Sequence, residues 1–442
     1  MSARSREDFM KKTWIFNALS VWVLMAGLPA GAAELNVAAL QVPLADVSVA
    51  GHPLHLSVGM GSGLAHARGT PAPVFYSVTD RGPNIACNKS AKIFGSQLCQ
   101  GKSVIFPVPT FTPRIYKLAL AGEEVKVLQS WPLHAVNQTA LTGLPPALTH
   151  AEKALNADLQ ALASSPDGVD SECIAVLDKG GFWIGEEYGP SLLRVNAEGA
   201  VLERLVPKGS EQAYAGSAVP IRAVLPPLLV KRTLNRGFEG IALAPDQRTL
   251  FVTLQSPFSN PDAETFKHSR NVRILKIALN AQGDFEKMAG AYVFQVPQVA
   301  QLAPDKKQKD VKVSALSAVN NHAVLAMVRA GKGLQVYLLN FAHASSLLGT
   351  AWAKAETTPS LEAQHDLEKV GIKPARATLI YDAAVGKGKL PEKVEGMSLV
   401  EGRTLVFITD NDFGIRGEQT EMVRVPLDAE AEARLRLSSA PA

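Results

Sequence analysis

One short pattern recurs five times along this chain, and it constrains the fold more than any other feature. Each copy has a small or acidic residue, then a small residue, then the apolar start of a β-strand. The copies are Ser62-Gly63-Leu64, Glu172-Cys173-Ile174, Glu239-Gly240-Ile241, Ser314-Ala315-Leu316 and Glu395-Gly396-Met397. A turn rich in Gly, Asp or Asn and a second β-rich run follow the copies, which predicts a series of hairpins. Self-similarity of this kind indicates a repeat architecture.

Half-exposed strands follow most of these hairpins. The runs at 114–118, 191–195, 273–277 and 422–425 alternate polar and apolar residues, which is typical of a strand with one face in the core. Two or three antiparallel strands per repeat, stacked as copies, predict an all-β fold of the β-propeller type. The alternative, a two-sheet sandwich, would explain the hairpins but not their repetition.

The spacing of the copies leaves the number of blades open between five and seven. Successive copies start 67 to 110 residues apart, whereas a compact blade needs about 40–50 residues, so long insertions must separate them. The widest gap has room for a further blade around residues 114–135, and we therefore expect six blades. Residues 148–164 and 361–370 have helical composition and periodicity, which predicts short helical insertions.

The first residues have the pattern of a cleavable signal peptide. A short basic start at 10–12 precedes a mostly apolar stretch at 14–28, and small residues follow at 29–33. We expect residues 1–33 to be removed and residues 34–442 to form a single propeller domain. The mature protein would then be periplasmic or secreted, without an integral membrane segment. The alternative is an uncleaved N-terminal anchor.

Charge and cysteine usage exclude some classes of function. The net charge of +4 over 442 residues is small and the basic residues are scattered, which argues against a nucleic-acid partner. Cys87 and Cys99 share one polar, Gly-rich loop, where an exported protein can form a disulfide. Cys173 lies in an apolar strand and is expected to be a buried free thiol. A zinc site is not expected, because the sequence contains no CxxC or HxxxH spacing.

Hairpin geometry predicts that acidic side chains gather at one end of the repeats. In an antiparallel hairpin, the residue before the first strand and the residues after the second lie at the same end. Glutamates stand before the first strand of three repeats, at Glu172, Glu239 and Glu395. Charged groups follow the second strand of three repeats, at Asp80-Arg81, Glu186-Glu187 and Asp410-Asn411-Asp412. We expect these residues to converge near the central channel.

Converging carboxylates raise one another's pKa values and need compensation. A hard cation is one candidate, since Ca²⁺ binds about six to eight oxygen ligands. The interleaved cations Arg81, Arg236, Arg329 and Lys393 are another, and such groups can also bind an anionic substrate. A third interpretation is purely structural: each acid accepts hydrogen bonds from the backbone of the neighbouring blade.

Several motifs in this order resemble those of exported phytase-like proteins, described as "esterase-like activity of phytase". They are the segments 75–84, 170–172, 183–191, 235–243 and 395–397. The resemblance spans roughly residues 50 to 426 and implies a β-propeller with ester or phosphoester hydrolase activity. One departure is visible, because members of the family tend to have Glu-Arg at the end of the fourth repeat's second strand. This chain has Val328-Arg329 there.

We therefore expect an exported hydrolase that acts on a small anionic ester or phosphoester and uses a divalent cation, calcium. The expected cation ligands are Glu172, Glu239, Glu395 and Asp410. The expected catalytic residues are Asp80 or Glu187 as general base and Arg81 on the anionic group, with Arg236 and Tyr188 contacting the substrate. Two alternatives remain: a non-catalytic binding or scaffold propeller, which Val328 favours, and a calcium-dependent lactone hydrolase.

Overall fold

Antiparallel strands fill each repeat of the computed structural model, which describes residues 35–70, 73–148, 152–386 and 388–440. Within these residues, five sheets form the blades of a propeller. Blade 1 contains β4 (Gly63–His66), β5 (Val74–Val78), β8 (Arg114–Ala121) and β9 (Glu124–Pro132). Blade 2 contains β12 (Ser171–Val176), β13 (Phe182–Glu186), β14 (Ser191–Val195) and β15 (Ala200–Pro207). Two short strands extend blade 2, β10 (His134–Ala135) and β16 (Ile221–Leu225).

The other three blades repeat the same meander. Blade 3 contains β17 (Phe238–Leu243), β18 (Thr249–Leu254), β19 (Asn271–Leu279) and β20 (Phe285–Gln295). Blade 4 contains β21 (Lys312–Ala318), β22 (Ala323–Ala330), β23 (Gly333–Asn340) and β24 (Arg376–Asp382). Blade 5 contains β25 (Val394–Val400), β26 (Thr404–Thr409), β27 (Thr420–Pro426) and the N-terminal β1 (Val37–Leu40).

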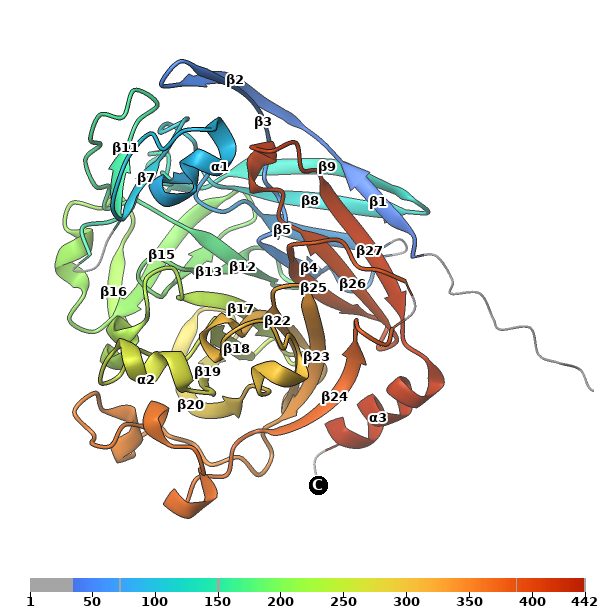
Figure 1. Ribbon diagram of the computed structural model, residues 1–442. Helices are drawn as coiled ribbons and strands as arrows, with labels where there is room; N and C mark the ends of the chain where they lie inside the picture. The colour runs from blue at the N-terminus through green and yellow to red at the C-terminus, as the bar shows by residue number, and fades with distance from the viewer. Residues whose placement is uncertain (1–34, 71–72, 149–151, 387, 441–442) are drawn as a thin grey trace, which may run out of the picture. The chain divides into compact units, whose positions relative to one another are not determined.

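The ring is closed in two ways. The innermost strands β4, β12, β17, β21 and β25 contact one another in order, and β25 returns to β4. In blade 5 the first strand, β1, pairs antiparallel with the last strand, β27, so the two meet in one sheet (Figure 1). The all-β propeller predicted from the sequence is confirmed, and the described residues from 35 onward form one compact unit.

The expectation of six blades is wrong, because the described residues form five. The strands at 114–135, which suggested a further blade, are mainly the outer strands of blade 1: β8 pairs with β5, and β9 pairs with β8. What lengthens this part of the chain is a pair of insertions. One lies between β5 and β8, and the other between β9 and β12.

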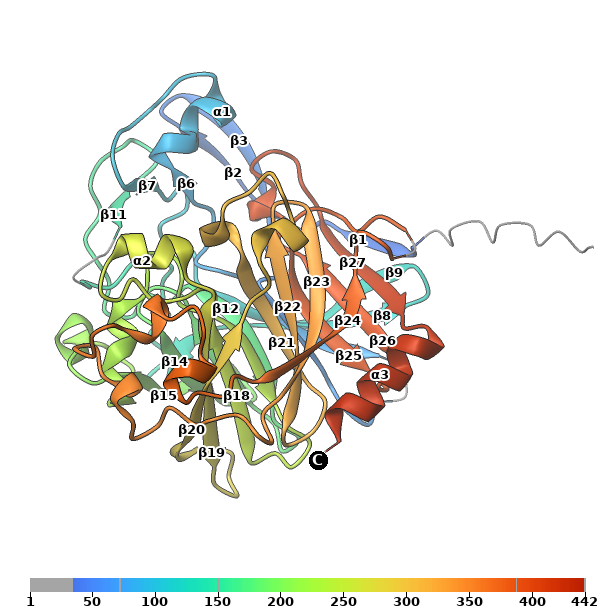
Figure 2. The same ribbon diagram turned by 60° about the horizontal axis from the view of Figure 1, so that its bottom comes forward.

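These insertions build a small subdomain beside blade 1. It contains β6 (Ile85–Ala86), α1 (Ser90–Phe94), β7 (Ser103–Ile105) and β11 (Lys153–Leu155), and it packs on the hairpin of β2 (Pro43–Val49) and β3 (His52–Ser57) through a shared apolar cluster. In Figure 2 these elements lie together at the top, to one side of the ring. Cys87 and Cys99 are joined by a disulfide in this subdomain, while Cys173 is buried and free.

The helical prediction for 148–164 is wrong in its described part. Residues Lys153–Leu155 form the parallel strand β11, which pairs with the otherwise open edge of β7. A turn follows, in which the Asn156 side chain accepts hydrogen bonds from the main-chain N–H groups of Asp158 and Gln160. The segment at 361–370 contains two short 3-10 turns, Leu361–Ala363 and Glu368–Val370. The α-helices α2 (Ala263–His268) and α3 (Ala429–Ser439) lie elsewhere in the chain.

The small residue of each repeat is required where neighbouring innermost strands touch. A Cβ atom on Gly240 would lie 3.0 Å from the backbone nitrogen of Leu316, and one on Gly63 would lie 2.8 Å from the Cα of Cys173. Close packing of this kind leaves no room for a larger side chain. Cys173 itself fits because its Sγ lies over Gly185, where a Cβ would be only 2.5 Å away.

The predicted signal peptide at 1–33 lies outside the described residues. Over the part of the chain that the structure describes, none of the helices has the length and apolar character needed to span a bilayer.

Candidate functional site

A β-bulge aims one residue of the repeat into the mouth of the channel. Ser171 pairs with Glu186 whereas Cys173 pairs with Gly185, which leaves Glu172 as the extra residue. The same one-residue slip occurs in β17, β21 and β25. A bulge of this kind bends the strand and redirects a side chain. The bulged residues are Glu172, Glu239, Ser314 and Glu395, and Ser62 holds the corresponding place before β4.

The strand register defines two more sets of equivalent positions beside the bulge. The main-chain N–H of Glu187 donates to the carbonyl of Asp170, and those of Gln255 and Asp410 donate to Gly237 and Lys393 in the same way. In blade 4, Lys312 is directly opposite Arg329. The residues at or just beyond the end of the second strand that occupy this equivalent position are thus Asp80, Glu187, Gln255, Arg329 and Asp410. Two positions before the bulge stand Asp170, Gly237, Lys312 and Lys393.

Three carboxylates meet where blades 1 and 2 adjoin. Asp80, Asp170 and Glu172 each offer an oxygen, and these oxygens all lie within 4.8 Å of one another. Two oxygens that bind one Ca²⁺ at about 2.4 Å can be at most about 4.8 Å apart, so the spacing fits a single cation. Asp170 and Glu172 are buried, and Asp80 is half-buried.

Main-chain hydrogen bonds fix two of these carboxylates. Asp80 Oδ1 accepts from the N–H of Gly82 at 2.8 Å, and Asp170 Oδ1 accepts from the N–H of Arg81 at 3.2 Å. The turn needs Gly82 because its φ is +101° and a Cβ there would strike Phe111. Each of these two carboxylates therefore uses one oxygen to hold the backbone and can direct the other toward the cluster.

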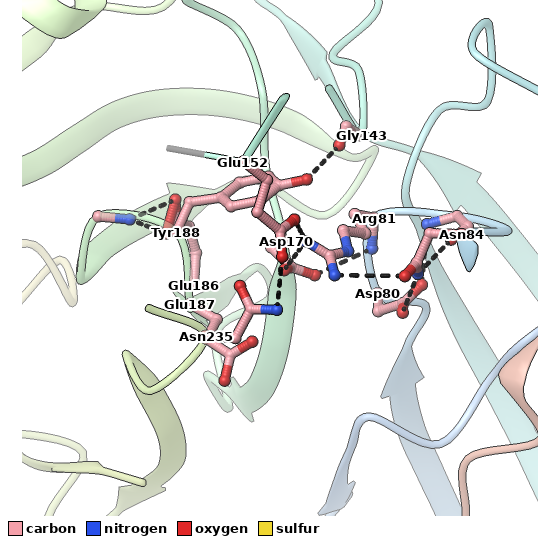
Figure 3. A network of polar contacts seen from close by, with 12 residues as sticks. Asp80, Arg81, Asn84, Gly143, Glu152, Asp170, Glu186, Glu187, Tyr188 and Asn235 are labelled. Carbon is pink, nitrogen blue, oxygen red and sulfur yellow. Dashed lines mark hydrogen bonds and ion pairs between the residues drawn. The ribbon is translucent and has the colours of Figure 1, made fainter. Parts of the chain in front are cut away.

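The charge of Arg81 is taken up by neighbouring side chains (Figure 3). Its Nη1 lies 2.6 Å from Glu152 Oε2 and 3.4 Å from Asp170 Oδ2, and its Nη2 donates to Asn84 Oδ1 at 3.2 Å. The Tyr188 ring lies 5.3 Å from the guanidinium, and the Tyr188 hydroxyl donates to the Gly143 carbonyl at 2.7 Å. Arg81 and Tyr188 are both buried. We infer that they brace the carboxylate cluster.

The negative charge of the carboxylate cluster is not fully balanced by nearby cations. The pKa values of Asp80 and Glu172 are raised well above their usual range, first because the groups are desolvated. Asp410 and Asp170 add to the shift at Asp80, and Glu239 and Asp170 add to the shift at Glu172. Arg81 opposes the shift at Asp80 without cancelling it. A bound cation would supply the missing charge.

Glu187 is influenced both by the carboxylate cluster and by a group of cations. Burial raises its pKa to about 7 and Asp170 contributes, while Lys312, Arg81 and Arg236 oppose the rise. Its Oε1 accepts a hydrogen bond from Gln255 Nε2 at 3.3 Å. A buried carboxyl group with a pKa near neutrality is suited to exchange protons with a substrate or a water molecule.

The remaining predicted ligands, Glu239, Glu395 and Asp410, lie outside the group of three close carboxylates. Glu395 Oε1 lies 2.5 Å from Arg329 Nη2. Burial would raise the pKa of Glu395, but Arg329 and Lys312 outweigh it and hold the pKa below its usual value. The pKa of Glu239 is raised well above normal, and that of Asp410 is raised to about 7, in both cases first by burial. These three acids are not members of the close carboxylate group.

Val328 does not remove an acid from the channel. The register aligns it with Glu186 of blade 2, and both side chains are buried. Val328 packs in the apolar core between blades. Glu186 is held by Arg204 at 2.7 Å instead of facing the other carboxylates of the channel. An acid at position 328 would therefore point away from the site, and the departure from the family pattern leaves the carboxylate cluster intact.

Sequence reasoning missed three residues of the site. Asp170 and Lys312 each stand two positions before a bulged residue, so comparing the five copies slightly upstream would have found them. Glu152 comes from the insertion between β9 and β12, where no repeat could reveal it. Its Oε2 contacts Arg81, and its Oε1 accepts from Asn235 Nδ2 at 2.9 Å.

Known proteins resemble this chain in sequence and in structure. An uncharacterized secreted protein of Arthroderma benhamiae is 28% identical over 137 residues, which is 28% of this chain and 26% of the relative. The match thus spans about a quarter of the relative's length. A gluconolactonase of Xanthomonas campestris (13% identity, TM-score 0.30) is matched over 88% of this chain and 98% of its own. A virginiamycin B lyase of Staphylococcus aureus (9% identity, TM-score 0.30) is matched over 88% and 99%. Scores this low carry no argument about function.

A family model matches most of the chain. The family is phytase-like, described as "Esterase-like activity of phytase", and the match covers residues 57–413. This range begins just before blade 1 and ends just after β26, so it includes the bulged residues and the carboxylate cluster. The chain belongs to the phytase-like family.

Proposed function

We propose that this protein is an exported hydrolase of carboxylic or phosphoric esters that uses a divalent cation held by Asp80, Asp170 and Glu172. The observation that carries the proposal is the convergence of these three carboxylates within 4.8 Å. Membership in a family described by esterase-like activity supports hydrolysis. The signal-peptide pattern at 1–33 and a relative described as secreted support export.

The donor set suits a hard cation such as calcium. All three groups are carboxylates, the ligand type that Ca²⁺ and Mg²⁺ prefer. Arg81 and Asn84 contact the cluster from one side and hold its geometry. When bound, the cation would polarise the ester group and offset the negative charge that develops during attack.

Glu187 is the proposed general base. It is fixed next to the cluster because its main-chain N–H bonds to Asp170, and its pKa of about 7 leaves a large fraction ionised at neutral pH. An ionised Glu187 can take a proton from a water molecule as that water attacks the ester, and it can return the proton to the leaving group. Asp80, the other base considered, is committed to the cluster.

Hydrolysis assays with and without a cation test this proposal. The mature protein would be assayed on a carboxylic ester, a phosphomonoester, a phosphodiester and a lactone, with EDTA and then with Ca²⁺, Mg²⁺ or Mn²⁺. We expect cation-dependent turnover of at least one ester class. Glu172→Gln should abolish it, whereas Glu203→Gln on the outer strand β15 should not. A protein that binds the cation yet hydrolyses none of these substrates would contradict catalysis and support the binding-propeller alternative.

A further inference from the structure

We propose that the channel also contains an anion-binding subsite, formed by Arg236, Lys312 and Arg329 across from the carboxylate cluster. This inference rests on the proposed function, because it takes the channel mouth as the place where the substrate binds. It names the substrate class more closely: an ester that carries a separate phosphate or carboxylate group.

Blade 4 reverses the charges that blade 2 places at equivalent positions. Lys312 stands where blade 2 has Asp170, and Arg329 stands where blade 2 has Glu187. The bulged position is Ser314 in place of an acid. Because these positions line the channel mouth in every blade, the reversal turns one wall of the channel basic while the facing wall remains acidic.

The cations of this basic wall (Arg236, Lys312 and Arg329) repel one another, and the groups around them do not neutralise this repulsion. Lys312 and Arg329 are directly opposite in the β21–β22 ladder, an arrangement that is unfavourable for like charges. Arg329 gains a partner in Glu395, but among the described residues no carboxylate lies within ion-pair distance of Lys312 or Arg236. Arg236 donates through Nη1 to the Ser256 hydroxyl at 3.0 Å, a neutral partner.

The nearby acids among the described residues act on Lys312 and Arg236 without forming ion pairs with them. Against the lowering effect of burial, Glu187, Glu239 and Asp310 raise the pKa of Arg236, and Glu239 and Glu395 raise that of Lys312. Glu395 is engaged by Arg329. Burial lowers the pKa of Lys312, and the positive charge of Arg236 lowers it further. An external anion would relieve this repulsion.

The chemistry of the wall indicates which anions fit. A guanidinium group can bind phosphate or carboxylate through two parallel hydrogen bonds, and an ammonium group adds a point charge. Ser256 and Ser314 hydrogen-bond to Arg236 and Arg329 and restrict how the two guanidinium groups lie. Asp170 of the carboxylate cluster and Lys312 and Arg236 of this wall all act on the pKa of Glu187. A substrate could therefore place its ester near Glu187 and its anionic group on blade 4.

Arg81, the residue expected to hold the anion, does not compete for this role. Its donors face Glu152, Asp170 and Asn84, and its side chain is about 8% exposed. The anion-binding function therefore falls mainly to Lys312 and Arg236, for which the described residues show no ion pair, with Arg329 as the third cation of the subsite.

Calorimetric titration of the mature protein with inorganic phosphate, in EDTA and at low salt, tests the subsite without the cation. We expect saturable binding that weakens by about tenfold or more in Lys312→Met and in Arg236→Gln, since each change removes a charged partner. Arg68→Gln should bind as the unmodified protein does, because Arg68 lines a cavity of about 90 Å³ at the opposite mouth. Thermal unfolding of each variant establishes that it is folded. Acetate replaces phosphate in a parallel titration, and the tighter binder identifies the group.

Three results would overturn the subsite: no binding of either anion, equal binding by folded Lys312→Met, or binding that requires Ca²⁺ and is lost only in Glu172→Gln. If anion binding fails while cation-dependent hydrolysis persists, the proposed function stands and the subsite falls. If anions bind as expected but no ester is hydrolysed, the subsite stands as a binding site and the hydrolase proposal falls.

Discussion

The main-chain N–H of Glu187 donates to the carbonyl oxygen of Asp170 over 2.9 Å, which joins the proposed base to a proposed cation ligand through the backbone. The link does not depend on either side chain. Substituting one side chain should therefore leave the position of the other in place, so that cation binding and proton transfer can be separated by mutation.

Glu187→Gln should lower kcat by roughly 10²- to 10⁴-fold, the usual contribution of a general base. The amide keeps the size and one acceptor of the carboxyl group but takes up no proton near neutral pH. Calcium-dependent stabilisation should persist in this variant, since Glu187 is not among the three close carboxylates. Steady-state kinetics and thermal unfolding provide both values. Loss of calcium stabilisation together with activity would instead make Glu187 a ligand.

Without a cation, the free energy of unfolding should fall as the pH rises from about 4.5 to about 7. The pKa values of Glu187 and Asp410 are raised to about 7 in the folded state, and that of Glu172 is raised well above its usual value, first by burial in each case. Between these limits the folded state holds more protons than the unfolded state, so raising the pH favours unfolding. Urea unfolding in EDTA at several pH values measures this.

Calcium should reduce this fall in the free energy of unfolding with rising pH, because it replaces the protons of the carboxylate cluster. If the free energy of unfolding in EDTA is equal or higher at the alkaline end of this range, other groups of the protein neutralise these carboxylates without a cation.

Arg81→Ala should destabilise the fold by about 3–5 kcal/mol, because it leaves Glu152 and Asp170 as buried carboxylates without their partner. Arg222→Ala is the matched control. Its partner is Glu203 in a half-exposed pair, where a loss of at most about 1 kcal/mol is expected. Chemical unfolding compares the two variants. A stable Arg81→Ala protein with a raised KM alone would return Arg81 to the substrate-binding role predicted from the sequence.

Gly240→Val should destabilise the ring by about 1–3 kcal/mol through overpacking. A Cβ at this position would already lie 2.7 Å from Thr253 Cγ2 and 3.0 Å from the Leu316 nitrogen. Cys173→Ala, at the equivalent place in blade 2, should cost less because it only removes the sulfur above Gly185. Thermal unfolding ranks the two. If the two variants were equally stable, the innermost strands could move apart without lowering the free energy of unfolding.

The repeats made the channel mouth predictable, because strand register carries each copy to the same place. The five motif copies do begin the innermost strands, and Glu172, Glu239 and Glu395 do occupy bulges. The number of blades was misjudged for a physical reason. Outer strands such as β8 and β9 have the same alternating pattern as a separate hairpin, and only their pairing with β5 shows that they belong to blade 1.

The charge partners in the site could not be predicted in the same way. Arg81 is neutralised by Glu152, which the chain brings in from an insertion 71 residues away. Such a contact depends on how the insertion folds back over the ring, and no local pattern encodes it. The repeated motif does not predict the basic wall, because Lys312 lies two residues before the first residue of the motif.

Calcium binding measured by thermal unfolding tests the central claim most directly. The mature protein would be compared in EDTA and in Ca²⁺, together with Asp80→Asn, Glu172→Gln and, as control, Asp178→Asn at the opposite mouth of the channel. The account predicts stabilisation of roughly 2.7 kcal/mol at about 100 times the Kd. It should be present in the unmodified protein and in Asp178→Asn, and absent in the two cluster variants. No shift with Ca²⁺, Mg²⁺ or Mn²⁺, or an equal shift in all four proteins, would contradict a cation held by Asp80, Asp170 and Glu172.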